Sequence, residues 1–321
     1  MTKKLIMLIV AFVCAATMTA QNIAVVSPGG QTTLYKTLQD ATKAAEPESV
    51  IYMPGGTFAG NDTIYKKLTI IGIGSKLILG NPDGSTYLSG EVFFSKGSDG
   101  SALMGCRCNK LRIGYETIAD VNDFLLKYNS IESLQISSNS GTIINQNYIN
   151  NLYGFSYGSS HSYSCLSLAN NIIGYIYGIK ESAVYNNIIV GGNYNAAESC
   201  INTYFSNNIF IKRSSISNST NCVTSGNMAT TDTSDDCINI GSVDWKDVFV
   251  KYDSTNPRNS NFHFKDAYKQ YENQVGIYAG TGFNDKQLAP VPYIVAKQVD
   301  EQTDAQGKLN IRVRVKAGDT E

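Results

Sequence analysis

The chain has 321 residues, of which 17% are charged, with a formal net charge of −1 and a pI near 6.2. This charge balance argues against a nucleic-acid-binding protein, which would carry a strongly basic surface. The low charge and the many Asn, Ser, Gly and Tyr residues favour short strands joined by tight turns over a helical protein.

The start of the chain has the pattern of a secretory signal. Lys3 and Lys4 precede an apolar stretch over residues 5–16, and small residues lead to Ala20. The apolar stretch is too short to span a bilayer. We therefore expect cleavage after Ala20, no membrane span, and export to the periplasm, the cell surface or the medium.

The next elements predict a cap followed by an array of strands. A strand and Pro-Gly turn at 24–30 are followed by apolar residues at helical spacing from Thr33 to Ala45, before Pro47. We expect residues 21–48 to form an N-terminal cap, because the first coil of an open solenoid would otherwise expose its core. Further strands are predicted at 50–53, 68–71, 77–79, 91–94, 102–104, 111–113 and 133–136.

The middle of the chain repeats an asparagine before apolar β-formers. The repeated positions are Asn147, Asn171, Asn187, Asn208 and Asn227, at steps of 24, 16, 21 and 19 residues. A period near 20 with variable insertions is typical of a solenoid. Asparagine tolerates the left-handed backbone region and hydrogen-bonds through its amide, so we expect a structural ladder at equivalent corners of successive coils.

Several segments together resemble a known family. They are Ser27–Gly30, Thr37–Ala41, Val50–Thr57, Leu68–Gly72, Asn261–Lys265, Val275–Gly280 and Ala289–Ile294. This layout resembles secreted right-handed parallel β-helix repeat proteins of the pectate-lyase-like type found in Bacteroides-like bacteria.

The resemblance implies an all-β fold with an N-terminal capping helix. It places a right-handed parallel β-helix with an irregular C-terminal cap over residues 49–288. A proline-rich linker and a β tail would follow over 289–321, where residues 309–316 alternate as in a half-buried strand. The resemblance implies no particular chemistry, since one fold hosts many functions.

One segment points to polysaccharide hydrolysis. Asp235 and Asp236, with Asp232 nearby, look like the paired aspartates of polygalacturonase-type enzymes, in which one carboxyl group protonates the leaving oxygen and another activates water. The Asn-Thr-Asp, Gly-His-Gly and Arg-Ile-Lys segments that accompany them in that family are absent. We therefore favour a solvated turn at 230–236.

Metal chemistry has little support in the sequence. A lyase would need acidic residues around Ca²⁺ and a base, but between residues 141 and 226 the acids are only Glu181 and Glu198. We expect no cofactor and no metal, with Ca²⁺ held by backbone carbonyls and one or two carboxylates as the open alternative. Cys106 and Cys108 are interpreted as small buried residues rather than metal ligands. The redox state of these two and of Cys165, Cys200, Cys222 and Cys237 is left open.

Tyrosines are the candidate binding residues. Tyr175 and Tyr177 place two rings on one face of a strand, and Tyr194 lies at a loop tip. A tyrosine ring suits the C–H face of a sugar, although aromatic residues also pack well on sheets. The sequence thus favours an exported, non-catalytic monomer that binds polysaccharide or cell-surface glycans or proteins. The alternatives are a hydrolase or lyase using Asp235 and Asp236, and a structural surface or matrix protein.

Overall fold

A computed structural model describes residues 22–75, 84–114, 121–136, 139–154, 164–191, 195–212, 216–230, 236–286, 293–299, 308 and 311–316. The predicted signal at 1–20 and the predicted strand at 77–79 lie outside these residues. None of the helices in the described ranges is long and apolar enough to cross a membrane.

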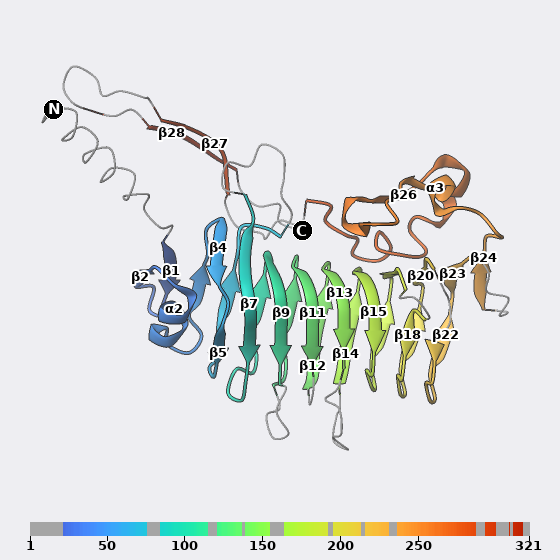
Figure 1. Ribbon diagram of the computed structural model, residues 1–321, viewed down its shortest axis with the longest axis horizontal. Coiled ribbons are helices and arrows are strands. Elements are labelled where there is room, and N and C mark those ends of the chain that lie inside the picture. Colours follow the sequence, from blue (N-terminus) through green and yellow to red (C-terminus); the bar gives the residue numbers. More distant parts are fainter. Residues whose placement is uncertain are drawn as a thin grey trace, which may run out of the picture.

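The described chain forms a parallel β-solenoid, as the asparagine period predicts (Figure 1). From β3 onward, each strand of the rod pairs in parallel with its counterpart in the next coil. Two sheets, called here sheet A and sheet B, contain 11 and 13 strands in the described ranges, and in sheet B the strands β5, β18 and β21 lie off the main path.

Sheet A runs in the order β2 (Thr32–Tyr35), β1 (Ile23–Val26), β3 (Val50–Tyr52), β6 (Thr69–Ile71), β8 (Ala102–Met104), β10 (Leu125–Lys127), β12 (Asn139–Asn145), β14 (Ser164–Ala169), β16 (Ala183–Tyr185), β19 (Tyr204–Ser206) and β22 (Val223–Ser225). Sheet B comprises β4 (Gly56–Ala59), β5 (Asp62–Ile64), β7 (Thr86–Phe94), β9 (Cys106–Ile113), β11 (Ser130–Ile136), β13 (Tyr148–Tyr153), β15 (Ile172–Tyr177), β17 (Ile188–Ile189), β18 (Ala197–Glu198), β20 (Ile209–Phe210), β21 (Ile216–Ser217), β23 (Asn227–Ala229) and β24 (Cys237–Asn239).

Sheet B has two outer faces. The start of β15 pairs with β17, whereas its end pairs with β18. The single strand β15 is therefore continued in the next coil by two short strands, β17 and β18, and the sheet bends between them. We call the outer side of β17, β20, β23 and the first two residues of β13 and β15 the covered face. We call the outer side of β18, β21 and the ends of β11, β13 and β15 the tyrosine face.

The interior of the rod is a column of aliphatic side chains in register. In sheet A, Ile70, Leu103, Leu126 and Ile144 occupy successive coils, and all are fully buried. Burying such a side chain contributes roughly 1.5–3 kcal/mol. Because every coil adds its own layer, the hydrophobic stabilisation grows along the rod.

The asparagine ladder is present and buried. The Asn147 backbone N–H and Nδ2 both donate to Asn171 Oδ1, at 2.8 and 3.1 Å. The Asn147 Nδ2 also donates to the carbonyls of Leu126 and Asn145, each at 2.9 Å. The coil-to-coil contact repeats through Asn171, Asn187 and Asn208 to Asn227. Each amide thus ties one coil to the next while its own polar atoms stay paired inside the rod.

The ladder begins one coil earlier than predicted. The Asn129 N–H donates to Asn147 Oδ1 at 2.9 Å, and Asn129 Oδ1 accepts from Cys106 N at 3.0 Å. The repeated sequence pattern does not include Asn129, because Tyr128 and Ser130 flank it in place of the polar residue or glycine before and the apolar residue after the other ladder asparagines. At the far end, Cys237 pairs in register with Asn227, so a cysteine stands beyond each end of the asparagine row.

The left-handed corner lies one residue before the predicted position. Gln146, Asn170, Asn186 and Asn207 have φ of 54°, 53°, 56° and 52°, whereas the ladder asparagines that follow them do not have positive φ. Our assignment of the strained conformation to the ladder asparagines was wrong. The doublet Asn-Asn divides the two tasks, because the first residue turns the chain and the second one bonds inward.

The N-terminal helix is shorter than predicted. Residues 32–35 form β2, which pairs antiparallel with β1, and α2 (Leu38–Ala44) begins only after Thr37. Thr37 caps α2 by accepting a hydrogen bond from the Asp40 N–H. Leu34 is 58% exposed, so it belongs to an edge strand and not to the apolar side of the helix.

The C-terminal segment, residues 241–286, packs along the side of the rod (Figure 1). It contains α3 (Trp245–Val248), β25 (Phe249–Lys251), η1 (Pro257–Asn259), β26 (Asn261–Phe264) and η2 (Asp266–Tyr271). Its apolar residues, among them Trp245, Phe262 and Ile277, bury the outward side chains of Ile188 and Ile209 on the covered face. The predicted C-terminal cap therefore covers a lateral face.

The corner residues hold this segment in place. Asn170 Nδ2 donates to the carbonyls of Ile277 and Ala279, at 2.9 and 2.6 Å. Gln146 Oε1 accepts from Asn284 N at 2.7 Å. The side chains of Gln146 and Asn170 thus point outward, where they bind backbone groups of the segment that covers the apolar face.

The tail contains two strands. β28 (Ile311–Lys316) matches the predicted terminal strand, and it pairs antiparallel with β27 (Tyr293–Val299). β27 was not predicted, because the residues from 289 to 294 were interpreted as a proline-rich linker.

Replacement of a ladder asparagine tests the role of these amides. Asn187→Leu leaves the Asn171 N–H and Nδ2 without their acceptor, and we expect a loss of about 2–4 kcal/mol in the free energy of unfolding. Urea denaturation followed by circular dichroism measures it. Asn256→Leu is the control, since Asn256 is exposed and makes no side-chain cap bond. Equal stability of the two variants would contradict the role of the ladder.

Candidate functional site

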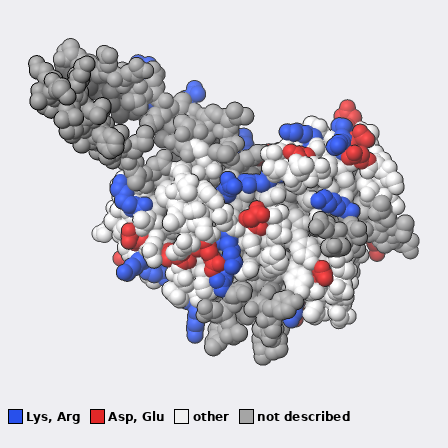
Figure 2. Space-filling view, in the orientation of Figure 1, with Lys and Arg blue, Asp and Glu red and all other residues white. Residues whose placement is uncertain are grey.

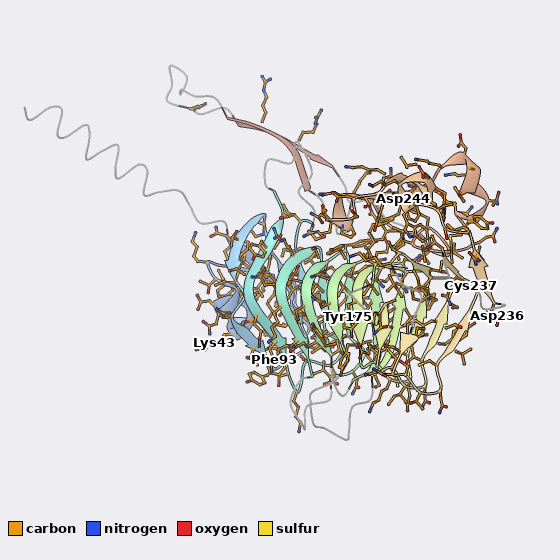
Figure 3. All side chains as sticks on the ribbon, turned by 45° about the vertical axis from the view of Figure 1, so that its right-hand side comes forward. Lys43, Phe93, Tyr175, Asp236, Cys237 and Asp244 are labelled. Carbon is orange, nitrogen blue, oxygen red and sulfur yellow. The ribbon has the colours of Figure 1, made fainter. Side chains whose placement is uncertain are left out.

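Tyrosine side chains gather on the tyrosine face because of strand alternation. Leu152 and Ile176 point into the core, so Tyr153 and Tyr177 point outward, and the two are paired in register. Their ring centroids are 6.4 Å apart in an edge-on arrangement. Tyr175 stacks beside Tyr177 at 6.3 Å with an interplanar angle of 30°. The two sequence-predicted tyrosines thus lie together in the middle of the rod, where Figure 3 labels Tyr175.

A carboxylate fixes the orientation of one ring. The Tyr175 hydroxyl donates to Glu198 Oε2 at 2.7 Å, and Asn218 Nδ2 donates to Glu198 Oε1 at 3.1 Å. Burial and this hydrogen bond to Glu198 raise the pKa of Tyr175. The hydrogen bonds from Tyr175 and Asn218 lower the pKa of Glu198. At neutral pH the pair is therefore a protonated phenol on a carboxylate, an arrangement that positions the ring and does not activate a nucleophile.

A groove of about 190 Å³ adjoins the cluster of rings at Tyr175. Tyr175 and the amides of Asn150 and Asn151 line one side, and Lys212 and Thr255 also contribute. Thr255 belongs to the C-terminal segment, so the groove is bounded by both the rod and the segment. An aromatic ring with amide, hydroxyl and ammonium groups around it can stack on an apolar surface and hydrogen-bond to polar groups at its edge.

The row of planar side chains continues toward the N-terminal coils. Tyr153 is in register with Gln135, which follows Arg112 and Phe93 of the preceding coils. The Arg112 guanidinium lies 4.7 Å from the Phe93 ring centroid and forms an ion pair with Glu91. Acidic and basic side chains are intermixed and sparse over the described surface in Figure 2. The charges near the row are thus locally neutralised.

Of the predicted catalytic aspartates, only Asp236 lies in the described ranges, and it is far from this face. Asp236 is exposed, and it precedes β24 at the C-terminal end of the rod, away from Tyr175 (Figure 3). Its backbone carbonyl accepts a hydrogen bond from Gly226 N. Asp232, Asp235 and Tyr194 lie outside the described residues.

The described cysteines are buried or partly buried thiols. Cys106 and Cys108 are fully enclosed, as their interpretation as small core residues predicts. Burial raises the pKa of Cys106 to about 12, so its thiol stays protonated at neutral pH. No group of three or more His, Cys, Asp and Glu side chains suited to a metal ion occurs among the residues that the structure describes.

A histidine network that the sequence did not indicate lies in the C-terminal segment. His263 stacks on Tyr278 with ring centroids 3.8 Å apart. Its Nδ1 is hydrogen-bonded to Glu272 Oε1, and its Nε2 lies 3.4 Å from Asp285 Oδ2. Because Phe264 N also donates to Glu272, this network fastens β26 to the turns that follow it. Its role is to hold the segment that borders the groove.

Searches against protein-family models, curated proteins and solved structures find no match to this chain. The solenoid fold and the tyrosine face therefore carry the functional argument on their own.

The network predicts how stability depends on pH. Burial alone would raise the pKa of Glu272, but hydrogen bonds from His263, Lys269 and the Phe264 N–H together lower it below its ordinary value of 4.5. The stability that ionised Glu272 contributes is then complete above about pH 4.5 and is lost as the pH falls through the lower pKa of the folded state.

We expect the melting temperature of the wild type to fall more steeply between pH 5 and 3 than that of Glu272→Gln. Differential scanning calorimetry at a series of pH values measures this difference. Glu48→Gln is the control. Glu48 forms an exposed ion pair with Lys67, which contributes little to stability, so this variant should keep the pH dependence of the wild type. Parallel curves for the wild type and Glu272→Gln would show that the network does not stabilise the fold.

Proposed function

We propose that the protein is an exported, non-catalytic β-solenoid that binds glycans on its tyrosine face. The observation that carries the proposal is the gathering of Tyr153, Tyr175 and Tyr177, from neighbouring coils, beside a polar groove. A tyrosine ring offers a flat apolar surface to the C–H face of a sugar, while nearby amides and hydroxyls exchange hydrogen bonds with the sugar's hydroxyl groups.

The solenoid geometry favours a chain of sugars as the ligand. Neighbouring coils repeat at about 4.8 Å, so equivalent side chains form a row along the rod. Tyr153, Tyr175 and Tyr177 are all partly exposed, which suits a glycan that extends along the row. Glu198 supports this arrangement by fixing the Tyr175 ring before the ligand binds, which lowers the entropic cost of binding.

Export and winding belong to the same proposal. The pattern of residues 1–20 supports secretion to the periplasm, the cell surface or the medium. Right-handed winding is supported by the general preference of parallel β connections, and it agrees with the resemblance to pectate-lyase-like β-helix proteins.

Alanine substitution tests the binding face. A glycan array probed with the chain from residue 21 onward identifies the ligand, and titration calorimetry then compares the variants. We expect Tyr175→Ala and Tyr177→Ala to weaken binding at least about tenfold, or about 1.4 kcal/mol, because each removes a stacking ring. Tyr204→Ala is the matched control, since Tyr204 is 44% exposed on sheet A, away from this face.

Two outcomes would contradict the proposal. One is equal binding by the wild type and both tyrosine variants. The other is cleavage of the same glycans, seen as new reducing ends or unsaturated products, that disappears in Asp236→Asn. That result would establish the polysaccharide-degrading alternative.

A further inference from the structure

A second recess lies between the covered face and the C-terminal segment, separate from the tyrosine groove. It is a cavity of about 40 Å³. Ser130, Tyr148 and Ile172 of the rod form its floor, and Arg258, Ser260, Phe262 and Phe283 of the segment form much of its walls. Its lining thus combines apolar surfaces, hydroxyl groups, one guanidinium and the carboxylate of Asp285.

Arg258 is a partly buried cation without a carboxylate partner among the described residues. Its guanidinium carbon lies 5.1 Å from the centre of the Tyr148 ring, and its Nη2 donates to the Ser75 carbonyl at 3.3 Å. Burial lowers the pKa of Arg258, yet a guanidinium remains charged in a protein. A desolvated charge without a counter-ion is costly, so this arrangement favours an anion beside it.

The nearby carboxylates are already engaged. Asp285 also lines the cavity, but its Oδ1 accepts from the Tyr278 hydroxyl at 2.7 Å and its Oδ2 faces His263 Nε2 at 3.4 Å. Glu132, which acts on Arg258 from farther away, accepts a hydrogen bond from Asn150 at 2.6 Å. Arg107 adds a second positive charge to the surroundings of Arg258. Arg258 and Arg107 thus balance the charges of Asp285 and Glu132, and it is the missing direct carboxylate partner of Arg258 that favours an anion in the cavity.

We propose that this cavity binds the carboxylate group of an organic acid, with Arg258 as its principal contact. A guanidinium and a carboxylate match in shape and can form two parallel hydrogen bonds. The volume corresponds to a few water molecules, so it accommodates a carboxylate on a short apolar body that lies against Phe262 and Phe283. The inference is independent of glycan binding on the tyrosine face.

The carboxylate can come from a free short acid or from an acidic sugar that reaches in from outside. Tyr148 lines both this cavity and the neighbouring groove, so a larger ligand could span the two. Propionate and glucuronate distinguish these sources, while propionamide and chloride at equal ionic strength control for uncharged binding and for salt. Binding of either acid supports the site and identifies the source.

Substitution of Arg258 tests the assignment in the full chain. Calorimetric titration of the wild type should give a dissociation constant in the millimolar range or tighter for at least one of the two acids. We expect Arg258→Gln to weaken this binding at least tenfold, and Arg258→Lys to weaken it less. Lys127→Gln is the matched control, because the Lys127 ammonium also lies over a tyrosine ring, at 4.9 Å from the centre of Tyr128, but does not line the cavity.

The folded state of each variant is checked by its melting temperature without ligand. If Arg258→Gln does not fold, Arg258→Lys still tests the proposal. The lysine keeps the positive charge but cannot form the paired hydrogen bonds to a carboxylate, so its affinity should be lower than that of the wild type. Binding of neither acid by the wild type, or equal affinity in the wild type and the folded Arg258 variants, would overturn the proposal.

Discussion

The rest of the structure depends on the need to pair a polar side chain inside an apolar rod. A buried amide costs several kcal/mol unless its oxygen and its NH₂ group find partners. Asn171 meets this condition by donating to Asn187 Oδ1 and to the carbonyls of Ile144 and Ala169 while it accepts from Asn147. These bonds can form only if the coils are stacked in one register. The ladder therefore adds a polar constraint on the register to the one that the buried aliphatic face already imposes.

The ladder also determines what lies outside the rod. Because the second residue of each doublet points inward, the first, such as Asn170, turns in the left-handed conformation and presents its side chain outward. The C-terminal segment binds these side chains and buries the covered face. The adjoining face then keeps Tyr175 and Tyr177 accessible at the border of the segment, and the cavity of Arg258 forms beneath it.

Features that repeat over short distances in the sequence could be predicted, whereas contacts between distant segments of the chain could not. The solenoid, the ladder positions and the pairing of Tyr175 with Tyr177 on one face follow from short periods in the chain. The helix start at Leu38 was missed because Leu34 fits a helical spacing but lies on an edge strand. The position of the C-terminal segment and the contact of Arg258 with Tyr148 could not be predicted, because they join residues about a hundred positions apart that share no pattern.

Hydrogen exchange of the ladder amides tests the central claim most directly. The backbone N–H groups of Asn147, Asn171 and Asn187 donate to side-chain oxygens of the next coil at corners, where loop amides ordinarily exchange quickly. If the ladder holds the register, these amides exchange as slowly as the strand amides of the core, through global unfolding alone. Exchange as fast as in the exposed turn at 253–256 would show that the corners open independently and that the ladder does not hold the coils together.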